Sequence, residues 1–378
     1  MVQPIGGTIL NPTIDAFLDH FGELEDNREA DKVLHPVREI LLVTLCGVLA
    51  GAEGWEDIED YGASKLPLLR EMLPFTHGIP SDDTLRRFFR AINPPAFQEV
   101  FVSFVRTLLP AAAERLIAID GKTSRRSHDG AVKALHVVSA FATEARLVLA
   151  QAATAEKSNE ITAIPELLRL LDLRGATVSI DALGCQREIA AQIGEGGGHY
   201  LLGLKGNQGT LHDDVRLFFE QPPKQTLCAT HEDTDKGHGR IEIRRCEVTE
   251  DIAWLQHTHG WPGLRSIARI TATRILGDTT TTESRYYLTD HGPDPQRILA
   301  ATRNHWAIEN TLHWTLAMSF GEDACRIRKD NAPLAIATIR HVAFNLLQAA
   351  KQKRESIKRL RKKAGWDNNT LKRILKFS

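Results

Sequence analysis

The stretch "RLIAIDGKTSRRS", residues 115–127, decides the fold class, because an apolar run ends there in an acid. A short apolar run bounded by turn residues is typical of a buried strand. The Gly-Lys-Thr that follows is no phosphate-binding loop. Such a loop needs Gly five residues before Gly121, where Leu116 stands, and a helix after it, whereas the next clear element here is a strand. The stretch therefore predicts a buried strand with Asp120 at its carboxyl end.

The residues that follow alternate between strand and helix patterns. Two β-rich runs joined by a turn come first, "ALHVVSAFA" and "RLVLAQAAT". They are followed by a helical pattern over 159–172, the strand "ATVSIDA", a helical pattern over 185–198 and the strand "HYLLGLK". This order predicts a mixed sheet flanked by helices, with its later strands parallel.

The regions before and after these alternating strands and helices have different residue patterns. Residues 35–62 have apolar residues at helical spacing, with Pro36 suited to a first turn and Gly62 to a stop, and Ser81 is a plausible N-cap of the next helix. Three β-rich runs, "GRIEIRRCEVTE", "LRSIARITATRIL" and "TTTESRYYLTD", predict an inserted sheet, and residues 293–320 predict one long helix. We expect the domains to be 1–112 (helical), 113–350 (α/β, with a β-rich insertion at about 209–290) and 351–378 (a basic tail).

The net charge of −1 conceals a strong asymmetry along the chain. Residues 1–60 hold 3 Lys and Arg against 13 Asp and Glu, whereas residues 351–378 hold 11 against 2. A basic end of this kind indicates a polyanionic partner, although a solvated end would also be charged. The longest apolar run, residues 40–52, is too short to span a bilayer, and the five cysteines are too scattered for a disulfide framework, so a cytosolic protein is expected.

Acids end two of the predicted strands, Asp120 the first and Asp181 the fourth. Sites in open α/β sheets gather at the carboxyl ends of strands, so the two acids share a crevice if the strands are neighbours. Two ionised carboxylates would repel each other there, and a divalent cation removes the conflict. Mg²⁺ prefers such oxygen ligands.

A third acid is expected from the long helix, where His305, Glu309 and His313 are four residues apart and lie on one face. The same face could hold zinc, but it lacks the His-Glu-x-x-His arrangement of helical zinc sites. Each acid taken alone also has an ordinary explanation as a turn, cap or solvated residue.

Eight blocks of this chain resemble the H-repeat-associated transposases of bacterial insertion sequences, a branch of the DDE transposases with a ribonuclease-H-like core. The blocks run in family order over roughly residues 15–350: "HPVREILLVTLCGVLAGAEGWEDIEDYG", "GIPSDDTLRRFFRAI", "IAIDGKTSRRS", "SIDALGCQREIA", "YLLGLKGNQ", "DKGHGRIEIRR", "NHWAIENTLHW" and "FGEDACRIRKDNAP". The resemblance implies that Asp120, Asp181 and Glu309 are an acidic triad that binds two Mg²⁺ or Mn²⁺ ions. It also implies that the β-rich stretch interrupts the core fold and that the N-terminal helices help to bind element ends.

The chain departs from the family pattern in two respects. The wider group of related transposases carries Tyr, Arg, Glu and Lys on its last catalytic helix, where this chain has Thr302, His305, Glu309 and Leu316. The closer family commonly has an Asp where Ala317 stands.

The expected activity is cleavage of DNA at the element ends and transfer of the cut strand into target DNA. The expected partners are double-stranded DNA, both terminal inverted repeats and target, and a second copy of the chain, in the bacterial cytoplasm at the nucleoid. The expected DNA contacts, which as basic surface residues could also be solubilising charge, are Lys122, Arg125, Arg126, Lys157, Lys205, Lys236, Arg240, His305 and His313. Two alternatives remain open: a ribonuclease-H-like nuclease that cuts without joining, and an inactive relic that only binds DNA.

Overall fold

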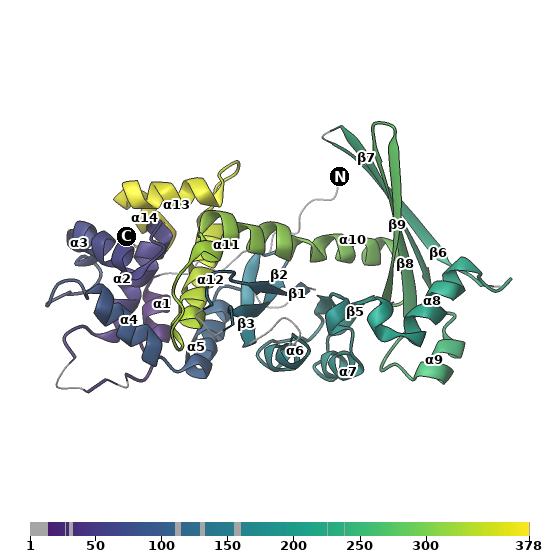
Figure 1. Ribbon diagram of the computed structural model, residues 1–378, viewed down its shortest axis with the longest axis horizontal. Coiled ribbons are helices and arrows are strands. Elements are labelled where there is room, and N and C mark those ends of the chain that lie inside the picture. The colour runs from purple at the N-terminus through teal and green to yellow at the C-terminus, as the bar shows by residue number, and fades with distance from the viewer. Residues whose placement is uncertain are drawn as a thin grey trace. The chain divides into compact units, whose positions relative to one another are not determined.

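The computed structural model describes residues 14–377 except 27, 30–32, 110–114, 129–132, 155–159, 225 and 238. The chain forms two compact units, drawn in Figure 1. Unit 1 consists of residues 1–113, 121–159 and 309–378, and unit 2 of residues 114–120 and 160–308. The domain limits expected at residues 112 and 350 stay a prediction.

Nine strands form one mixed sheet in the order β3-β2-β1-β4-β5-β9-β8-β7-β6. β1, β4 and β5 are parallel neighbours, β2 and β3 are antiparallel, and each pairing from β5 through β9, β8 and β7 to β6 is antiparallel. The bounds are β1 (Leu116–Thr123), β2 (His136–Ala142), β3 (Leu147–Thr154), β4 (Thr177–Ile180), β5 (His199–Leu204), β6 (Ala229–Gly237), β7 (Arg240–Thr249), β8 (Ser266–Leu276) and β9 (Thr279–Thr289). The expected mixed sheet flanked by helices is confirmed.

The parallel strands of unit 2 lie between helices. Residues 116–119 of β1 and all of β4 are buried, as expected for parallel strands covered on both faces. Figure 1 shows α6 (Glu160–Arg169) and α7 (Arg187–Glu195) on one side of this part of the sheet and α10 (Pro295–His305) on the other. Both faces are therefore closed, and the ends of the strands are where polar side chains can gather.

Strands β6 to β9 form the β-rich insertion, together with α8 (Thr210–Glu220) and α9 (Ala253–His259). Near its base, Val248 of β7 and Ile270 of β8 pack with Ile298 and Leu299 of α10. Three of the four strands were expected. β6 was missed because its sequence, "ATHEDTDKG", is acidic and mostly exposed and so lacks the apolar alternation that marks a strand.

The helix expected over residues 293–320 is not uniform. After α10 ends at His305, a π-helical turn, η5 (Ile308–His313), precedes α11 (Trp314–Ser319). Glu309 lies in this turn. Single π-helical turns occur frequently at functional sites, and their wider winding is invisible in a residue pattern.

The N-terminal part of unit 1 is helical, as expected, with α1 (Ile14–Phe21), α2 (Val37–Ala50), α3 (Trp55–Leu69), α4 (Asp82–Ala91) and α5 (Pro94–Arg106). Ser81 caps α4 by accepting a hydrogen bond from the Thr84 N–H at 3.3 Å. The expectation that Gly62 stops a helix is wrong. α2 ends at Gly51, which has φ of +119°, whereas Gly62 lies inside α3, where a Cβ would come within 2.8 Å of Val43.

The rest of unit 1 packs β2 and β3 against long helices. In α12 (Ala332–Ala350), the Asn345 amide donates to the Val148 carbonyl at 2.9 Å and accepts from the Val148 N–H at 2.8 Å, so it satisfies both backbone groups of a buried residue in β3. The basic C-terminal residues form α13 (Ile357–Trp366) and α14 (Asn368–Leu375), in which Leu360, Leu371 and Ile374 are buried.

In the part of the chain that the structure describes, no helix combines the length and apolar character needed to cross a membrane. All five cysteines are free thiols.

Candidate active site

Asp120 and Asp181 follow paired positions on two neighbouring parallel strands. Ile119 of β1 lies opposite Ile180 of β4, and an aspartate directly follows each of them. Asp181 comes after the end of β4, whereas β1 continues to Thr123, so the expectation that Asp120 ends its strand is wrong: it directly follows the part of β1 that pairs with β4. Neighbouring strands lie about 4.8 Å apart, and residues in register point to the same face. Both side chains are half-buried. The condition that the two strands be neighbours is therefore met.

The backbone after Asp181 is held by a small set of hydrogen bonds. The Asp181 carboxylate accepts from the Leu183 N–H at 2.9 Å and so caps the short helix η3 (Ala182–Gly184). On β5, a Cβ at Gly203 would lie 3.2 Å from the Ala182 nitrogen and 3.4 Å from the Asp181 carbonyl carbon. Glycine at position 203 therefore lets β5 approach the loop that carries this acid.

Two amides beyond β5 hold the same loop. Asn207 Nδ2 donates to the Ala182 carbonyl at 2.8 Å, and Gln208 Nε2 donates to the Cys185 carbonyl at 2.5 Å. Both residues lie just beyond Lys205, which is one of the expected DNA contacts. In the structure they position the segment after Asp181, a role that no local pattern indicates.

His305 lies near Asp181 in unit 2. Its Nδ1 is 3.0 Å from the Ser179 hydroxyl on β4. Burial lowers the pKa of His305, and the charge of Asp181 opposes this shift only in part. Neutral imidazole is the form present at neutral pH, so a DNA contact by His305 would not be a charged one.

Glu309 and His313 lie on the π-helical turn and belong to unit 1. The Glu309 side chain is exposed, and His313 is half-buried. Burial, reinforced by the charge of Lys122, lowers the pKa of His313 to about 3. His313, like His305, therefore carries no positive charge to a phosphate at neutral pH.

Lys122, one of the expected phosphate contacts, is held by two acids of unit 1. Its Nζ lies 2.9 Å from Glu322 Oε2 and 2.6 Å from Asp323 Oδ1, and only 13% of its side chain is exposed. Arg125, by contrast, is 82% exposed, and its Nε lies 3.8 Å from Asp323. The acid pair at 322–323 thus compensates the charge of Lys122.

The remaining expected DNA contacts lie at the surface or outside the described residues. Arg126, Lys205, Lys236 and Arg240 are exposed, and Lys157 lies outside the described ranges. Arg240 Nε is 3.1 Å from Glu242 on its own strand. Their DNA contacts stay predictions.

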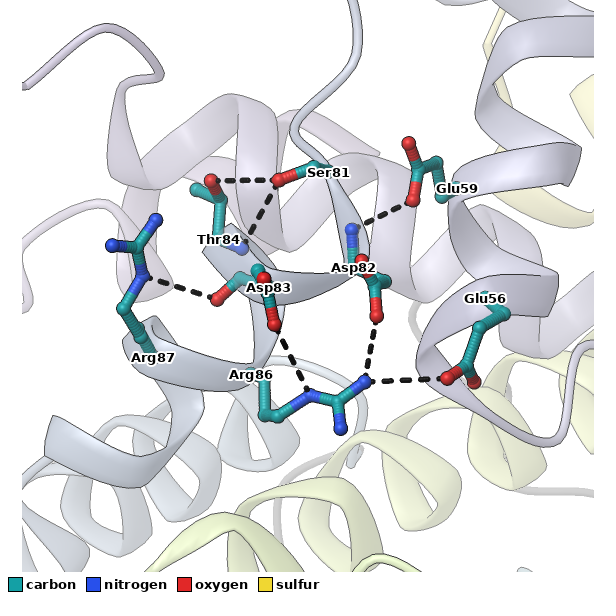
Figure 2. A network of polar contacts seen from close by, with 8 residues as sticks. All are labelled: Glu56, Glu59, Ser81, Asp82, Asp83, Thr84, Arg86 and Arg87. Atoms are coloured by element: carbon teal, nitrogen blue, oxygen red, sulfur yellow. Dashed lines mark hydrogen bonds and ion pairs between the residues drawn. The ribbon is translucent and has the colours of Figure 1, made fainter.

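The arginine face of α4 is also paired with acids, as Figure 2 shows. Arg86 lies 2.6 Å from Asp82, 3.2 Å from Glu56 and 3.9 Å from Asp83, and Arg87 donates to the Asp83 carbonyl at 3.3 Å. Arg86 therefore has its charge compensated within unit 1. A cavity of about 440 Å³ lies beside it, with Arg90, Arg326, Arg328 and Lys329 among its lining residues.

Asp120 and Asp181 suit a hard cation. Carboxylates that follow paired residues of two neighbouring strands supply the oxygen donors that Mg²⁺ and Mn²⁺ take, and a bound cation would offset any repulsion between them.

Comparisons with known proteins show the family of the chain. The model of the Transposase DDE domain matches residues 111–346, and that of the DDE_Tnp_1-associated domain matches residues 18–105. The H repeat-associated putative transposase YhhI of Escherichia coli (strain K12) is 40% identical over 371 residues, which cover 95% of this chain and 97% of that protein. Putative transposase YncI of Escherichia coli O157:H7 is 38% identical over 96% of this chain and 95% of its own length.

Among solved structures, a chain of the piggyBac transposase synaptic complex with hairpin DNA aligns over 96% of this chain and 78% of its own, with a TM-score of 0.43 and 10% identity. The two domain models and the relatives of nearly full length show the family directly. This chain belongs to the DDE transposase family and is similar over almost its whole length to H repeat-associated transposases.

Proposed function

We propose that the chain cuts DNA at the ends of an insertion sequence and joins the cut strand to target DNA in a metal-dependent phosphoryl transfer. The observation that carries the proposal is that Asp120 and Asp181 each directly follow the last paired residues, Ile119 and Ile180, of two neighbouring parallel strands. Family membership supplies the reaction class.

In this proposal Asp120 and Asp181 hold two Mg²⁺ or Mn²⁺ ions, and Glu309 completes the coordination of one. Such ions activate the attacking oxygen and stabilise the leaving oxygen of an in-line displacement. Asn207 and Gln208 fix the loop after Asp181 and so keep its carboxylate in place. His305, neutral and close to β4, serves as a hydrogen-bonding group and not as a cation.

We further propose that the substrate is double-stranded DNA with terminal inverted repeats, that exposed Arg125, Arg126, Lys236 and Arg240 contact its phosphates, and that two copies act on two element ends in the bacterial cytoplasm. Solvent-exposed arginine and lysine side chains suit this role because phosphate binding releases counterions from DNA.

A strand-transfer assay tests the reaction. Labelled duplexes that carry the inverted repeats flanking the gene are incubated with the full chain, Mg²⁺ and a target plasmid. Joined product supports transposition, cut ends without joining support the nuclease, and a mobility shift without cutting supports a relic that only binds DNA.

Asp120→Asn and Asp181→Asn test the assigned residues. Each is expected to lower the cleavage rate about a thousandfold or more, because metal stabilisation of the transition state is worth several kcal/mol. Asp172→Asn is the matched control, since Asp172 is an exposed acid of the same unit paired with Arg174. Equal activity in all three variants would refute the assignment.

A further inference from the structure

We propose that His199, Asp290 and His291 form a second metal site, which binds a divalent transition metal of the zinc class. The three residues belong to unit 2. His199 begins β5, and Asp290 and His291 directly follow β9.

The three side chains already converge. Each offers a ligand atom, and these atoms all lie within 4.8 Å of one another. The two imidazole rings have centroids 4.5 Å apart, and His199 Nδ1 is 2.9 Å from Asp290 Oδ2. Ligands of a tetrahedral zinc ion with bonds of about 2.0–2.1 Å are about 3.3 Å apart. Side-chain movements of an ångström or so would therefore reach coordination geometry.

Hydrogen bonds from the surrounding strands support the ligands. The Tyr200 N–H donates to Asp290 Oδ1 at 2.8 Å, and His291 Nε2 lies 2.9 Å from the Thr177 hydroxyl. The Ser266 hydroxyl donates to the His291 carbonyl at 2.8 Å. Partners of this kind, which orient the ligating groups, are a regular part of metal sites in proteins.

The donor set determines the kind of metal. Two imidazoles and one carboxylate suit Zn²⁺ or Co²⁺, whereas Mg²⁺ takes mainly oxygen donors. His291 is buried and 14% of the Asp290 side chain is exposed, but 44% of the His199 side chain is exposed. The open side at His199 gives an ion access and leaves a fourth position for water.

This site is separate from the acids of the proposed active site. Thr177, at the start of β4, pairs with His199, whereas Asp181 follows the last residue of the same strand. Four residues of a strand span about 13 Å. The metal would join the start of β5 to the end of β9, where the insertion returns to the parallel strands, so it would stabilise this junction whether or not the chain is an active transposase.

The test uses the full chain, purified without a histidine tag, stripped of metal, and carrying D120N and D181N so that the proposed catalytic ions do not contribute. Zinc is titrated against a chromogenic chelator, cobalt(II) is added separately to record its visible absorption, and thermal melting is followed with and without zinc. We expect one zinc per chain, a cobalt spectrum of a low-coordinate nitrogen and oxygen site, and a higher melting temperature with zinc.

Ligand variants assign the site. His199→Gln, at a half-exposed position, is expected to weaken zinc binding at least about tenfold, and His199→Cys is expected to restore it while shifting the cobalt spectrum through its thiolate. His257→Gln, at an exposed histidine of the same unit, is the control and should change nothing. Failure of the parent to take up one zinc per chain, or unchanged zinc binding by His199→Gln, would overturn the proposal and leave the three residues as a hydrogen-bonded cluster.

Discussion

The end of β1 and the hairpin formed by β6 and β7 both carry basic residues expected at DNA, but the surroundings of these residues differ. Lys122 is 13% exposed and lies between Glu322 and Asp323, with Glu322 itself only 5% exposed. Lys236 and Arg240 of the hairpin are exposed. A basic residue held by buried acids stabilises the fold, whereas one at the surface is available to a phosphate. Nearness in sequence to Asp120, a proposed metal ligand, does not tell these two kinds of basic residue apart.

The largest expected effect is that of Lys122→Met on stability. Removing the ammonium group leaves Glu322 as an uncompensated buried charge, which typically costs about 3–5 kcal/mol. Urea denaturation should show this loss in the free energy of unfolding, and Lys122→Met combined with Glu322→Gln should recover part of it. Arg125→Met, at the 82% exposed position, is the control and should change stability by less than about 0.5 kcal/mol. If Lys122→Met and Arg125→Met lowered the free energy of unfolding equally, the distinction between a paired and an exposed basic residue would be refuted.

Arg361 extends the contrast to the basic C-terminal end. Its guanidinium is buried, donates to the carbonyls of Val48 at 2.8 Å and Ala52 at 3.1 Å and to that of Ser319, and stacks 4.5 Å from the centre of the Phe320 ring. Burial lowers its pKa to about 10, which leaves it charged at neutral pH.

Arg361→Met should therefore destabilise the chain by about 2–3 kcal/mol, because several carbonyls lose a charged donor. Thermal and urea unfolding measure the change. Arg359→Met, two residues earlier and exposed, should be nearly neutral. If both variants unfold alike, the C-terminal arginines act only through net charge.

His313 gives a pH-dependent form of the same contrast. Its folded pKa of about 3 lies below the ordinary value of 6.5, so the unfolded chain binds a proton more readily than the folded one. The free energy of unfolding is therefore unaffected by His313 above pH 6.5. It decreases progressively as the pH falls from 6.5 toward 3, because the unfolded chain takes up a proton on this residue and the folded chain does not.

Between pH 6.5 and 5 this amounts to at most about 2 kcal/mol, from 1.36 kcal/mol per pKa unit. His313→Gln should flatten the fall in unfolding free energy over that interval. His257→Gln, an exposed control, should leave the slope unchanged. A slope unaffected by His313→Gln would mean that other groups, such as buried His341, carry the acid sensitivity.

The parts of the fold that sequence predicts are those where neighbouring residues carry the signal. Asp120 and Asp181 stand out because each ends an apolar run, and the alternation of strands and helices predicts that the two strands share a sheet. β6 was missed because exposed acids replace apolar alternation, and the π-helical turn at Glu309 was missed because its winding leaves no periodic mark.

Contacts between residues that are distant in the sequence are even harder to predict from it. The partners of Lys122 lie some 200 residues later, and those of His199 lie 91 residues away, so no spacing rule finds either cluster. Asn207 and Gln208 are polar residues just after a strand, yet they donate to backbone carbonyls, which no local pattern indicates. The sequence shows which residues are charged, but only the folded structure shows which of these charges are compensated by a neighbouring group.

The smallest effect on stability, and the clearest on DNA, is expected from Lys236→Gln with Arg240→Gln. Both side chains are exposed, and unfolding free energy should change by no more than about 0.5 kcal/mol. If each contacts one phosphate, the slope of log affinity against log salt should fall by about 2 in the double variant, since each lost contact removes close to one counterion from the release. Lys224→Gln, an exposed lysine outside the hairpin, is the control. An unchanged slope would mean that the DNA does not contact the hairpin. Arg125 and Arg126 would then be the next residues to vary, because both are exposed like Lys236 and Arg240, whereas their neighbour Lys122 is already paired with acids.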